Sequence, residues 1–239
     1  MKKLLLIFLF IPFLSLSQLK YMPKSNGEII KYKYYSLSYN EEHEQAEWVH
    51  YKLDSTMLKG KEKRENYRFK EDTKDSITSS STDYDYQKYK YEKGHLAPFA
   101  DMKMDSTSAS ESFYMFNISP QKKDFNRGEW RQLEDNVRSL AKKNELYITT
   151  GGVLKSGLNK IGKKNKVSVP EFFYKIIYDT KNEEMTAYLM PNKKLYSSFE
   201  NYTVTVDLIE ILTGIDFYHQ LEAELEERLE SVKNSSPAK

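Results

Sequence analysis

The chain has 239 residues, with 37 Lys and Arg against 35 Asp and Glu, and it contains no cysteine. This balance excludes a strongly basic nucleic-acid-binding protein, so any anionic partner must meet a local basic patch. The missing cysteines exclude disulfides, and the fold must therefore be stabilised by a packed hydrophobic core.

Residues 1–17 have the pattern of a signal peptide. Lys2 and Lys3 precede the apolar run "LLLIFLFIPFL", and small residues lead to a cleavage point before Gln18. The alternative is an uncleaved anchor, although the run is short for a membrane span. We expect a cleaved, secreted or periplasmic chain with no stable membrane association, in which basic and acidic residues balance at 35 each once both lysines are removed.

The remaining sequence predicts strands and helices interleaved without a regular βαβ rhythm. We expect strands within 33–53, 111–121, 145–154, 171–179 and 185–192, a mobile surface loop over 72–85, and helices over 127–144, 205–214 and 220–232. This order favours an α+β single domain with a mainly antiparallel central sheet flanked by helices. The expected division is an N-terminal extension (18–34), the main domain (35–222), and a C-terminal helix with a frayed tail (223–239).

The pair Gly94-His95, within "YEKGHLAPFADM", is the first candidate for chemistry. A neutral imidazole accepts a proton from water near pH 7, and Gly94 allows the ring to be presented without a flanking side chain. A structural histidine after a tight turn is the competing interpretation. The pair alone does not decide between them.

The segment "NISPQKKDFNRGEW" and the helix after it carry further candidates. Asn126 could cap that helix, or its amide oxygen could bind Mg²⁺. Glu134 and Arg138 could form a surface ion pair, or they could order metal-bound water and bind phosphate. Helical spacing predicts that all three lie along one side of the helix.

Together, "EKGHLAP", "NISPQ" and "FNRGEWRQLEDNVR" closely resemble the DNA/RNA non-specific endonucleases, which are ββα-metal (His-Me finger) nucleases. The signature of that family is Asp-Arg-Gly-His, then Asn-Ile-x-Pro-Gln, Asn-x-Gly-x-Trp and Leu-Glu. Flanking blocks are also similar and occur in the same order, over about residues 35–220. The resemblance implies that the domain contains a ββα-metal finger.

The resemblance also implies roles for individual residues. His95 would be the general base that activates water, and Asn126 would be the single protein ligand of Mg²⁺, for which Mn²⁺ can substitute. Glu134 would hold the water shell of the metal. Asn117 would orient its neighbours in the site.

Substrate phosphate would be bound by Lys93, Arg138 and an upstream arginine. Either Arg64 or Arg68 could be that arginine, with Arg64 the first choice. The sequence departs from the family at Glu92-Lys93, where Asp-Arg is usual. Lysine keeps the positive charge but lacks the bidentate geometry of arginine, so a slower or altered site is expected.

These residues predict a secreted metal-dependent endonuclease that cuts DNA and RNA with little sequence specificity. Two alternatives remain open: a non-catalytic nucleic-acid-binding descendant of the same fold, and a phosphodiesterase that acts on a smaller substrate. The sequence indicates no particular oligomeric state.

Overall fold

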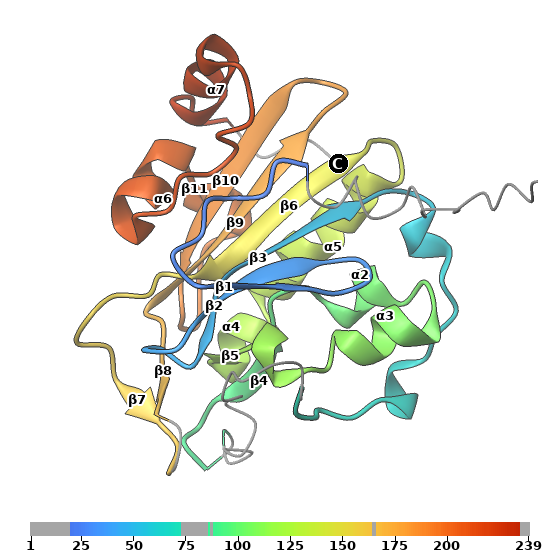
Figure 1. Cartoon of the computed structure of the whole chain (residues 1–239), viewed down its shortest axis with the longest axis vertical. Helices are drawn as coiled ribbons and strands as arrows, with labels where there is room; N and C mark the ends of the chain where they lie inside the picture. Colours follow the sequence, from blue (N-terminus) through green and yellow to red (C-terminus); the bar gives the residue numbers. More distant parts are fainter. Residues whose placement is uncertain (1–19, 73–85, 87, 164–165, 235–239) are drawn as a thin grey trace, which may run out of the picture.

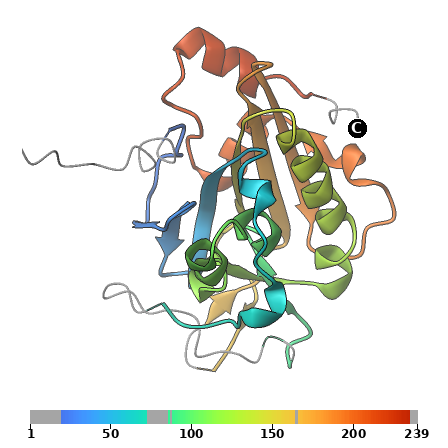
Figure 2. The same ribbon diagram turned by 90° about the vertical axis from the view of Figure 1, so that its right-hand side faces the viewer.

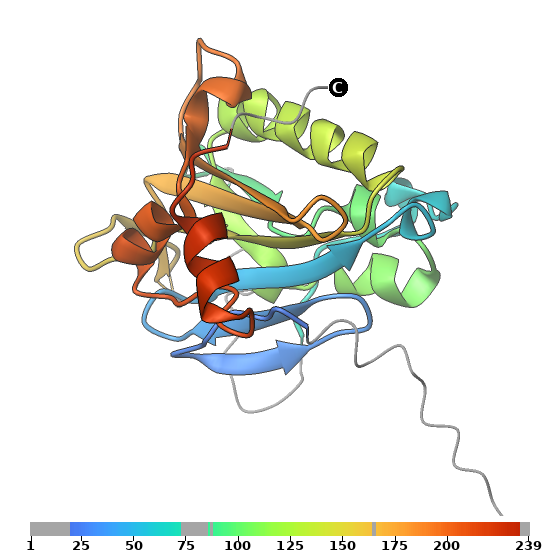
Figure 3. The same ribbon diagram turned by 90° about the horizontal axis from the view of Figure 1, so that it is seen from above.

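A computed structural model describes residues 20–72, 86, 88–163 and 166–234 of the chain. The expected signal peptide and nearly all of the expected loop 72–85 lie outside these residues. The main sheet has the order β1-β2-β3-β6-β9-β10-β11, and every neighbouring pair is antiparallel. Its strands are β1 (Glu28–Lys31), β2 (Ser36–Asn40), β3 (Gln45–Leu53), β6 (Leu146–Gly152), β9 (Phe172–Asp179), β10 (Glu184–Pro191) and β11 (Thr203–Val204). Figure 3 shows this sheet with the blue strands at one edge and the gold and orange strands at the other.

Two short ribbons and several helices surround this sheet. The ribbons pair β4 (Glu92–His95) with β5 (Ile118–Gln121), and β7 (Lys160–Ile161) with β8 (Val167–Ser168). The α-helices are α2 (Phe99–Met102), α3 (Ser106–Glu111), α4 (Lys123–Asn126), α5 (Glu129–Ala141), α6 (Val206–Thr213) and α7 (Ala223–Glu230). The 3-10 turns are η1 (Met57–Lys59), η2 (Arg64–Asn66), η5 (Met115–Asn117) and η6 (Phe199–Tyr202).

Both faces of the sheet are buried, and each face packs against different helices. Along β3, Val49 and Tyr51 join the core that includes α5, whereas Trp48 joins the core that includes α6 and α7. This alternation is the period of two that a strand imposes on its side chains. Figures 1 and 2 show α5 lying along the sheet. The predicted α+β class with a mainly antiparallel sheet and flanking helices is confirmed.

The helix predicted over 127–144 is confirmed as α5, although it begins later than expected. Its apolar stripe is Trp130, Leu133, Val137 and Ala141, all buried against the sheet. Gly128, with φ −96° and ψ −124°, is not helical and is the N-cap of α5. It therefore separates α5 from the helix before it.

Two expectations for Asn126 are therefore wrong. Asn126 is the last residue of the separate helix α4, so it neither caps α5 nor shares a helical face with Glu134 and Arg138.

The strand expected over 111–121 is wrong except for β5. The chain there forms the end of α3 and the η5 turn before it reaches Ile118. Helix α3 begins at a capping box, in which Asp105 accepts from the backbone of Ser108 and the Ser108 hydroxyl bonds back to Asp105. Phe113 is buried in a turn and Met115 in η5, so their apolar character does not indicate a strand.

The other predicted elements are present. Strands β2, β3, β6 and β9 lie within the expected ranges, β10 begins one residue earlier than expected, at Glu184, and α6 ends at Gly214 with φ +69°. Strand β1 lies within 18–34 and helix α7 within 223–239. Among the described residues, no helix combines the length and apolarity that a membrane crossing requires.

Candidate functional site

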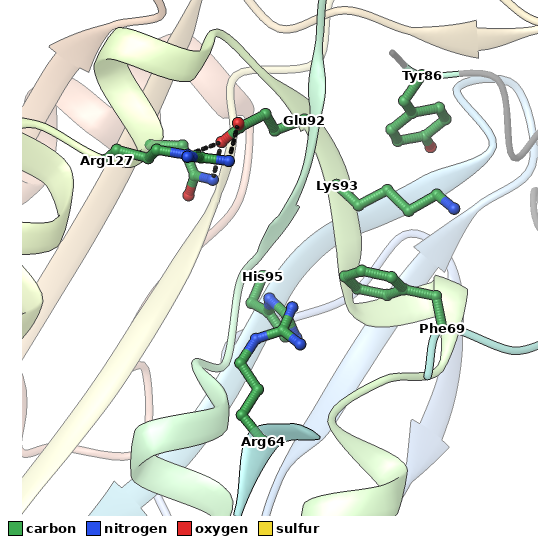
Figure 4. Close-up of a pocket in the computed structure, with 8 residues that line it drawn as sticks. Arg64, Phe69, Tyr86, Glu92, Lys93, His95 and Arg127 are labelled. Atoms are coloured by element: carbon green, nitrogen blue, oxygen red, sulfur yellow. Dashed lines mark hydrogen bonds and ion pairs between the residues drawn. The ribbon is translucent and has the colours of Figure 1, made fainter. Parts of the chain in front are cut away.

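The β4–β5 ribbon and helix α4 border a cavity of about 570 Å³ (Figure 4). Residues of η2, β4 and α4 line it together with two aromatic side chains: Arg64, Phe69, Tyr86, Glu92, Lys93, His95, Asn126 and Arg127. Four residues predicted from the sequence are among them, namely Arg64, Lys93, His95 and Asn126. The expected convergence of the histidine and the asparagine on one cavity is therefore observed.

The His95 ring is held between aromatic side chains. Its centroid lies 5.3 Å from that of Phe69 and 5.1 Å from that of Phe113, which meets it edge-on at 89°. The buried Nε2 atom has no hydrogen-bond partner among the described residues. Burial, and then the positive charge of Arg64, lowers the pKa of His95 to about 3. The ring is therefore neutral at pH 7, which leaves a ring nitrogen that can accept a proton.

Gly94 is required because Gln121 packs against it from the paired strand. A Cβ atom at position 94 would collide with the Gln121 side chain, which is fully buried. Close packing across the ribbon, and not a positive φ, explains this glycine. The interpretation that Gly94 only frees space around His95 is thus incomplete.

Asn117 lies behind the cavity and fixes the turn that follows β4. Its Oδ1 accepts from the Ala97 amide at 2.8 Å, and its Nδ2 donates to the carbonyls of Ala97 and Ser112, each at 2.9 Å. All three bonds are buried, and the two to Ala97 hold the backbone two residues after His95. The role predicted for Asn117, of orienting its neighbours in the site, stays a prediction.

Glu92 connects β4 to α4. Its carboxylate accepts from Nδ2 of Asn126 at 2.9 Å and forms an ion pair with Arg127 at 2.6 Å (Figure 4). Because the amide nitrogen of Asn126 faces Glu92, its Oδ1 is directed elsewhere and remains the atom that can bind a cation. One amide oxygen beside an open, polar cavity suits Mg²⁺, which keeps several waters and takes few protein ligands.

Arg64 lines the cavity, whereas Arg68 does not. The guanidinium carbon of Arg64 lies 4.8 Å from the Phe113 ring and 5.7 Å from the Phe69 ring. Within the described part of the chain, Arg64 forms no ion pair. Its hydrogen-bonding groups are therefore available to an anion. Arg68 instead donates to the carbonyls of Glu65 and Tyr67.

Glu134 and Arg138 do not line this cavity and belong to a neighbouring buried network. Arg138 forms ion pairs with Asp101 at 2.8 Å and with Asp135 at 2.6 Å. Burial raises the pKa of Glu134 to about 7, and the charge of Lys175 opposes this rise. The roles implied for Glu134 and Arg138, in the metal's water shell and in phosphate binding, stay predictions.

Three comparisons place the chain among known proteins. The family model for DNA/RNA non-specific endonucleases matches residues 16–224. The chain belongs to this family. A nuclease of Nostoc sp. is 34% identical to it over 82% of this chain and 75% of the relative.

The mitochondrial nuclease EXOG of Danio rerio is 29% identical over 84% of this chain. The match covers 64% of that relative, so the chain spans less than two thirds of its length. A crystal structure of EndoG in complex with EndoGI superposes with a TM-score of 0.76 at 25% identity, covering 89% of this chain and 93% of that one. Membership of the family, together with this likeness, identifies the β4–β5–α4 unit as the ββα-metal finger.

The sequence did not predict several of the residues that line the cavity beside the β4–β5 ribbon and α4. Arg127 and the aromatic residues Phe69 and Tyr86 were not predicted there. Arg127 directly follows Asn126, and this adjacency was the only sequence signal for it. Phe69 is close to the upstream arginines in the sequence, but nothing in its surroundings distinguishes it from a core aromatic residue.

Proposed function

We propose that this chain is a Mg²⁺-dependent endonuclease that hydrolyses phosphodiester bonds of DNA and RNA with little sequence specificity, and that Mn²⁺ can replace Mg²⁺. One observation carries the proposal: His95, whose buried Nε2 atom has no hydrogen-bond partner among the described residues, lines the same cavity as Asn126 and the basic side chains Arg64 and Lys93. Membership of the endonuclease family supports the same activity.

His95 would act as the general base. Its neutral ring would take a proton from a water molecule, and the resulting hydroxide would attack phosphorus. The bond between phosphorus and the leaving oxygen breaks as the new one forms, and the leaving oxygen takes a proton from solvent water. The rings of Phe69 and Phe113 hold the imidazole in place, so little motion is needed at the moment of proton transfer. Asn126 would hold the Mg²⁺ ion, which when bound offsets negative charge on the phosphate and on the leaving oxygen.

Arg64 and Lys93 would bind the phosphate. Contacts with phosphate and sugar carry no direct sequence information, so such a site cuts with little preference. The nucleophile is water and not a ribose hydroxyl, so DNA and RNA are both substrates. Glu92, although longer than the usual aspartate, still reaches Asn126 and Arg127, which supports a working site.

The test is cleavage of supercoiled plasmid and of RNA by the purified protein with Mg²⁺, with and without EDTA. Nicking of plasmid and fragmentation of RNA that EDTA abolishes are expected. Retarded migration without cutting would instead indicate the binding-only descendant. Activity confined to a small phosphodiester, such as a bis(nitrophenyl) phosphate, would indicate the third alternative.

Export is part of the same proposal and rests on the pattern of residues 1–17. Mass spectrometry of the protein recovered from the periplasm or the medium is expected to give a mature chain that starts at Gln18. A chain that is retained in the cell with its N-terminus intact would refute export. Several relatives are named as mitochondrial proteins, which makes retention the competing outcome.

Arg64→Ala is expected to lower kcat/KM by about 10- to 100-fold, because a charge-assisted contact with phosphate contributes about 1.5–3 kcal/mol. Arg68→Ala is the matched control, since Arg68 is exposed and bonded to local carbonyls. It is expected to stay within about twofold of the unmodified protein, in line with the usual effect of surface changes. Steady-state cleavage of a fluorescent oligonucleotide measures both. Equal losses in the two variants would refute the assignment of Arg64.

The acid limb of the kcat/KM profile depends on His95 in the free enzyme. The pKa of His95 is lowered to about 3, so the ring remains neutral well below pH 6 and that limb is expected at strongly acidic pH. Part of the lowering comes from the charge of Arg64. Arg64→Gln is therefore expected to raise the pKa of His95 and to move the limb to higher pH, whereas Arg68→Gln leaves it in place. NMR titration of the His95 ring protons measures the pKa directly, and an unchanged pKa in Arg64→Gln would contradict this account.

A further inference from the structure

A second group of acidic side chains lies between helices α6 and α7. Carboxylate oxygens of Asp207, Glu210 and Glu230 all lie within 4.8 Å of one another. Both helices pack on the face of the sheet opposite α5. Figure 1 shows α6 and α7 at the upper left, well separated from the β4–β5 ribbon and α4. The group is therefore distinct from the candidate active site.

Glu230 is the member that calls for an explanation. Glu230 is only 5% exposed, and its buried Oε1 atom has no hydrogen-bond partner among the described residues. Glu230 is also the last residue of α7, where the carbonyl end of the helix carries partial negative charge. A buried carboxylate without a partner is costly, and the helix end makes this position less favourable still.

The surrounding charges do not compensate for Glu230. Burial, and then the negative charge of the nearby carboxylates, Glu210 first, raises the pKa of Glu230 to about 9. Lys24 is bonded to Asp216 at 2.5 Å, and Arg228 of α7 pairs with Glu183. Across the described residues, no lysine or arginine nitrogen lies within 4.0 Å of the three clustered carboxylates.

The remaining titratable neighbours add mainly negative charge. Glu226 and Asp216 act on Glu230 as like charges, and His219 acts on Glu226. One oxygen of Glu210 accepts from the Phe217 amide at 2.7 Å, which ties the loop after α6 to the group. A divalent cation would neutralise this concentration of negative charge and would satisfy the unpartnered oxygen.

We propose that Asp207, Glu210 and Glu230 bind a Ca²⁺ ion that joins α6 to α7. Ca²⁺ prefers oxygen ligands at about 2.3–2.6 Å, so oxygens up to about 4.8 Å apart can contact one ion. Mg²⁺ needs shorter, near-octahedral contacts at about 2.0–2.1 Å and fits this spacing less well. Water would fill the other positions of the ion. The site holds the C-terminal helix and the 214–217 loop in place, and its role is structural.

The test uses the full mature protein, first stripped with EDTA and dialysed, and measures binding in two ways. Terbium luminescence sensitised by tyrosine reports a lanthanide at the site and is displaced by Ca²⁺. Thermal unfolding reports stabilisation: with a Kd of about 10⁻⁴ M, 10 mM Ca²⁺ is expected to raise Tm by about 5 °C or more.

Glu230→Gln and Asp207→Asn each remove one charged ligand from the site. Both are expected to weaken Ca²⁺ binding at least about tenfold and to lose most of the Tm shift, while cleavage in Mg²⁺ at 25 °C is unchanged. Glu224→Gln, at an exposed position of the same helix, is the matched control and keeps the shift. Asn126→Ala separates this site from the catalytic metal, because it too should keep the Ca²⁺ shift.

Two results would overturn the proposal. One is an unmodified protein whose Tm does not respond to Ca²⁺, which would mean that the three carboxylates share a proton instead. The other is a Tm shift of full size in both Glu230→Gln and Asp207→Asn, which would place the ion elsewhere. Asp207 is only half-buried, so its variant keeps the test informative if Glu230→Gln does not fold.

Discussion

His95→Ala is expected to lower the turnover of plasmid and RNA by about 10²–10⁴-fold, which is the usual contribution of a positioned general base. The substitution removes the imidazole that lines the cavity and leaves Arg64, Lys93 and Asn126 unchanged. Substrate binding, which depends on the basic side chains, should change much less than turnover. The loss is therefore expected in kcat, with KM nearly constant.

The unfolding temperature of His95→Ala should remain close to that of the unmodified protein. The imidazole nitrogen Nε2 makes no hydrogen bond that would be lost, although some packing against Phe69 and Phe113 disappears. His219→Ala serves as the control, because His219 lies beyond α6 and far along the chain from the ribbon. Full activity in His95→Ala, measured by single-turnover cleavage, would remove His95 from the mechanism.

The sequence predicts the strands of the main sheet well. These strands are buried on both faces, and their successive side chains still point to opposite faces. Trp48, Val49 and Tyr51 divide between the two cores as a period of two requires. The same pattern-based reasoning gives a wrong strand for the segment before β5. There, burial comes from helix α3 and from irregular backbone, and apolar composition alone does not distinguish these from a strand.

The site is predictable in its residue types and less so in its arrangement. Neighbouring short motifs identify His95 and Asn126, but the placement of Asn126 depends on the helix break at Gly128, which helical periodicity does not reveal. The sequence also does not reveal which residues become the partners of buried side chains. Asp101 lies 37 residues from Arg138 in the sequence, and only the folded chain brings them to 2.8 Å.

The departure at Glu92-Lys93 illustrates what the structure adds. From the sequence, the longer carboxylate suggests a disturbed turn and a weaker site. In the structure, Glu92 reaches across to α4 and bonds both Asn126 and Arg127. The extra methylene thus supports a contact that sets the direction of the Asn126 amide. Lys93 extends along the cavity wall with its Nζ 5.2 Å from the Phe69 ring centre.

Asn126→Ala is expected to lower cleavage at 1 mM Mg²⁺ by more than about 100-fold, because it removes the one protein oxygen assigned to the ion. The loss should be partly reversed at higher Mg²⁺ concentration, since a weaker site still fills when the ion is abundant. A titration of nicking rate against Mg²⁺ concentration separates this effect on metal affinity from a loss of chemistry, which extra Mg²⁺ would not repair.

Glu92→Gln is the matched variant for Asn126→Ala. It keeps an oxygen that can accept from the Asn126 amide but removes the charge that pairs with Arg127. Partners that orient a metal ligand typically contribute about 10–100-fold to metal affinity or activity, so a loss in that range is expected, smaller than that of Asn126→Ala. The order of the two losses is decisive, because Asn126 would bind the ion whereas Glu92 would only orient it. A Mg²⁺ dependence in Asn126→Ala equal to that of the unmodified protein would show that the ion is held elsewhere.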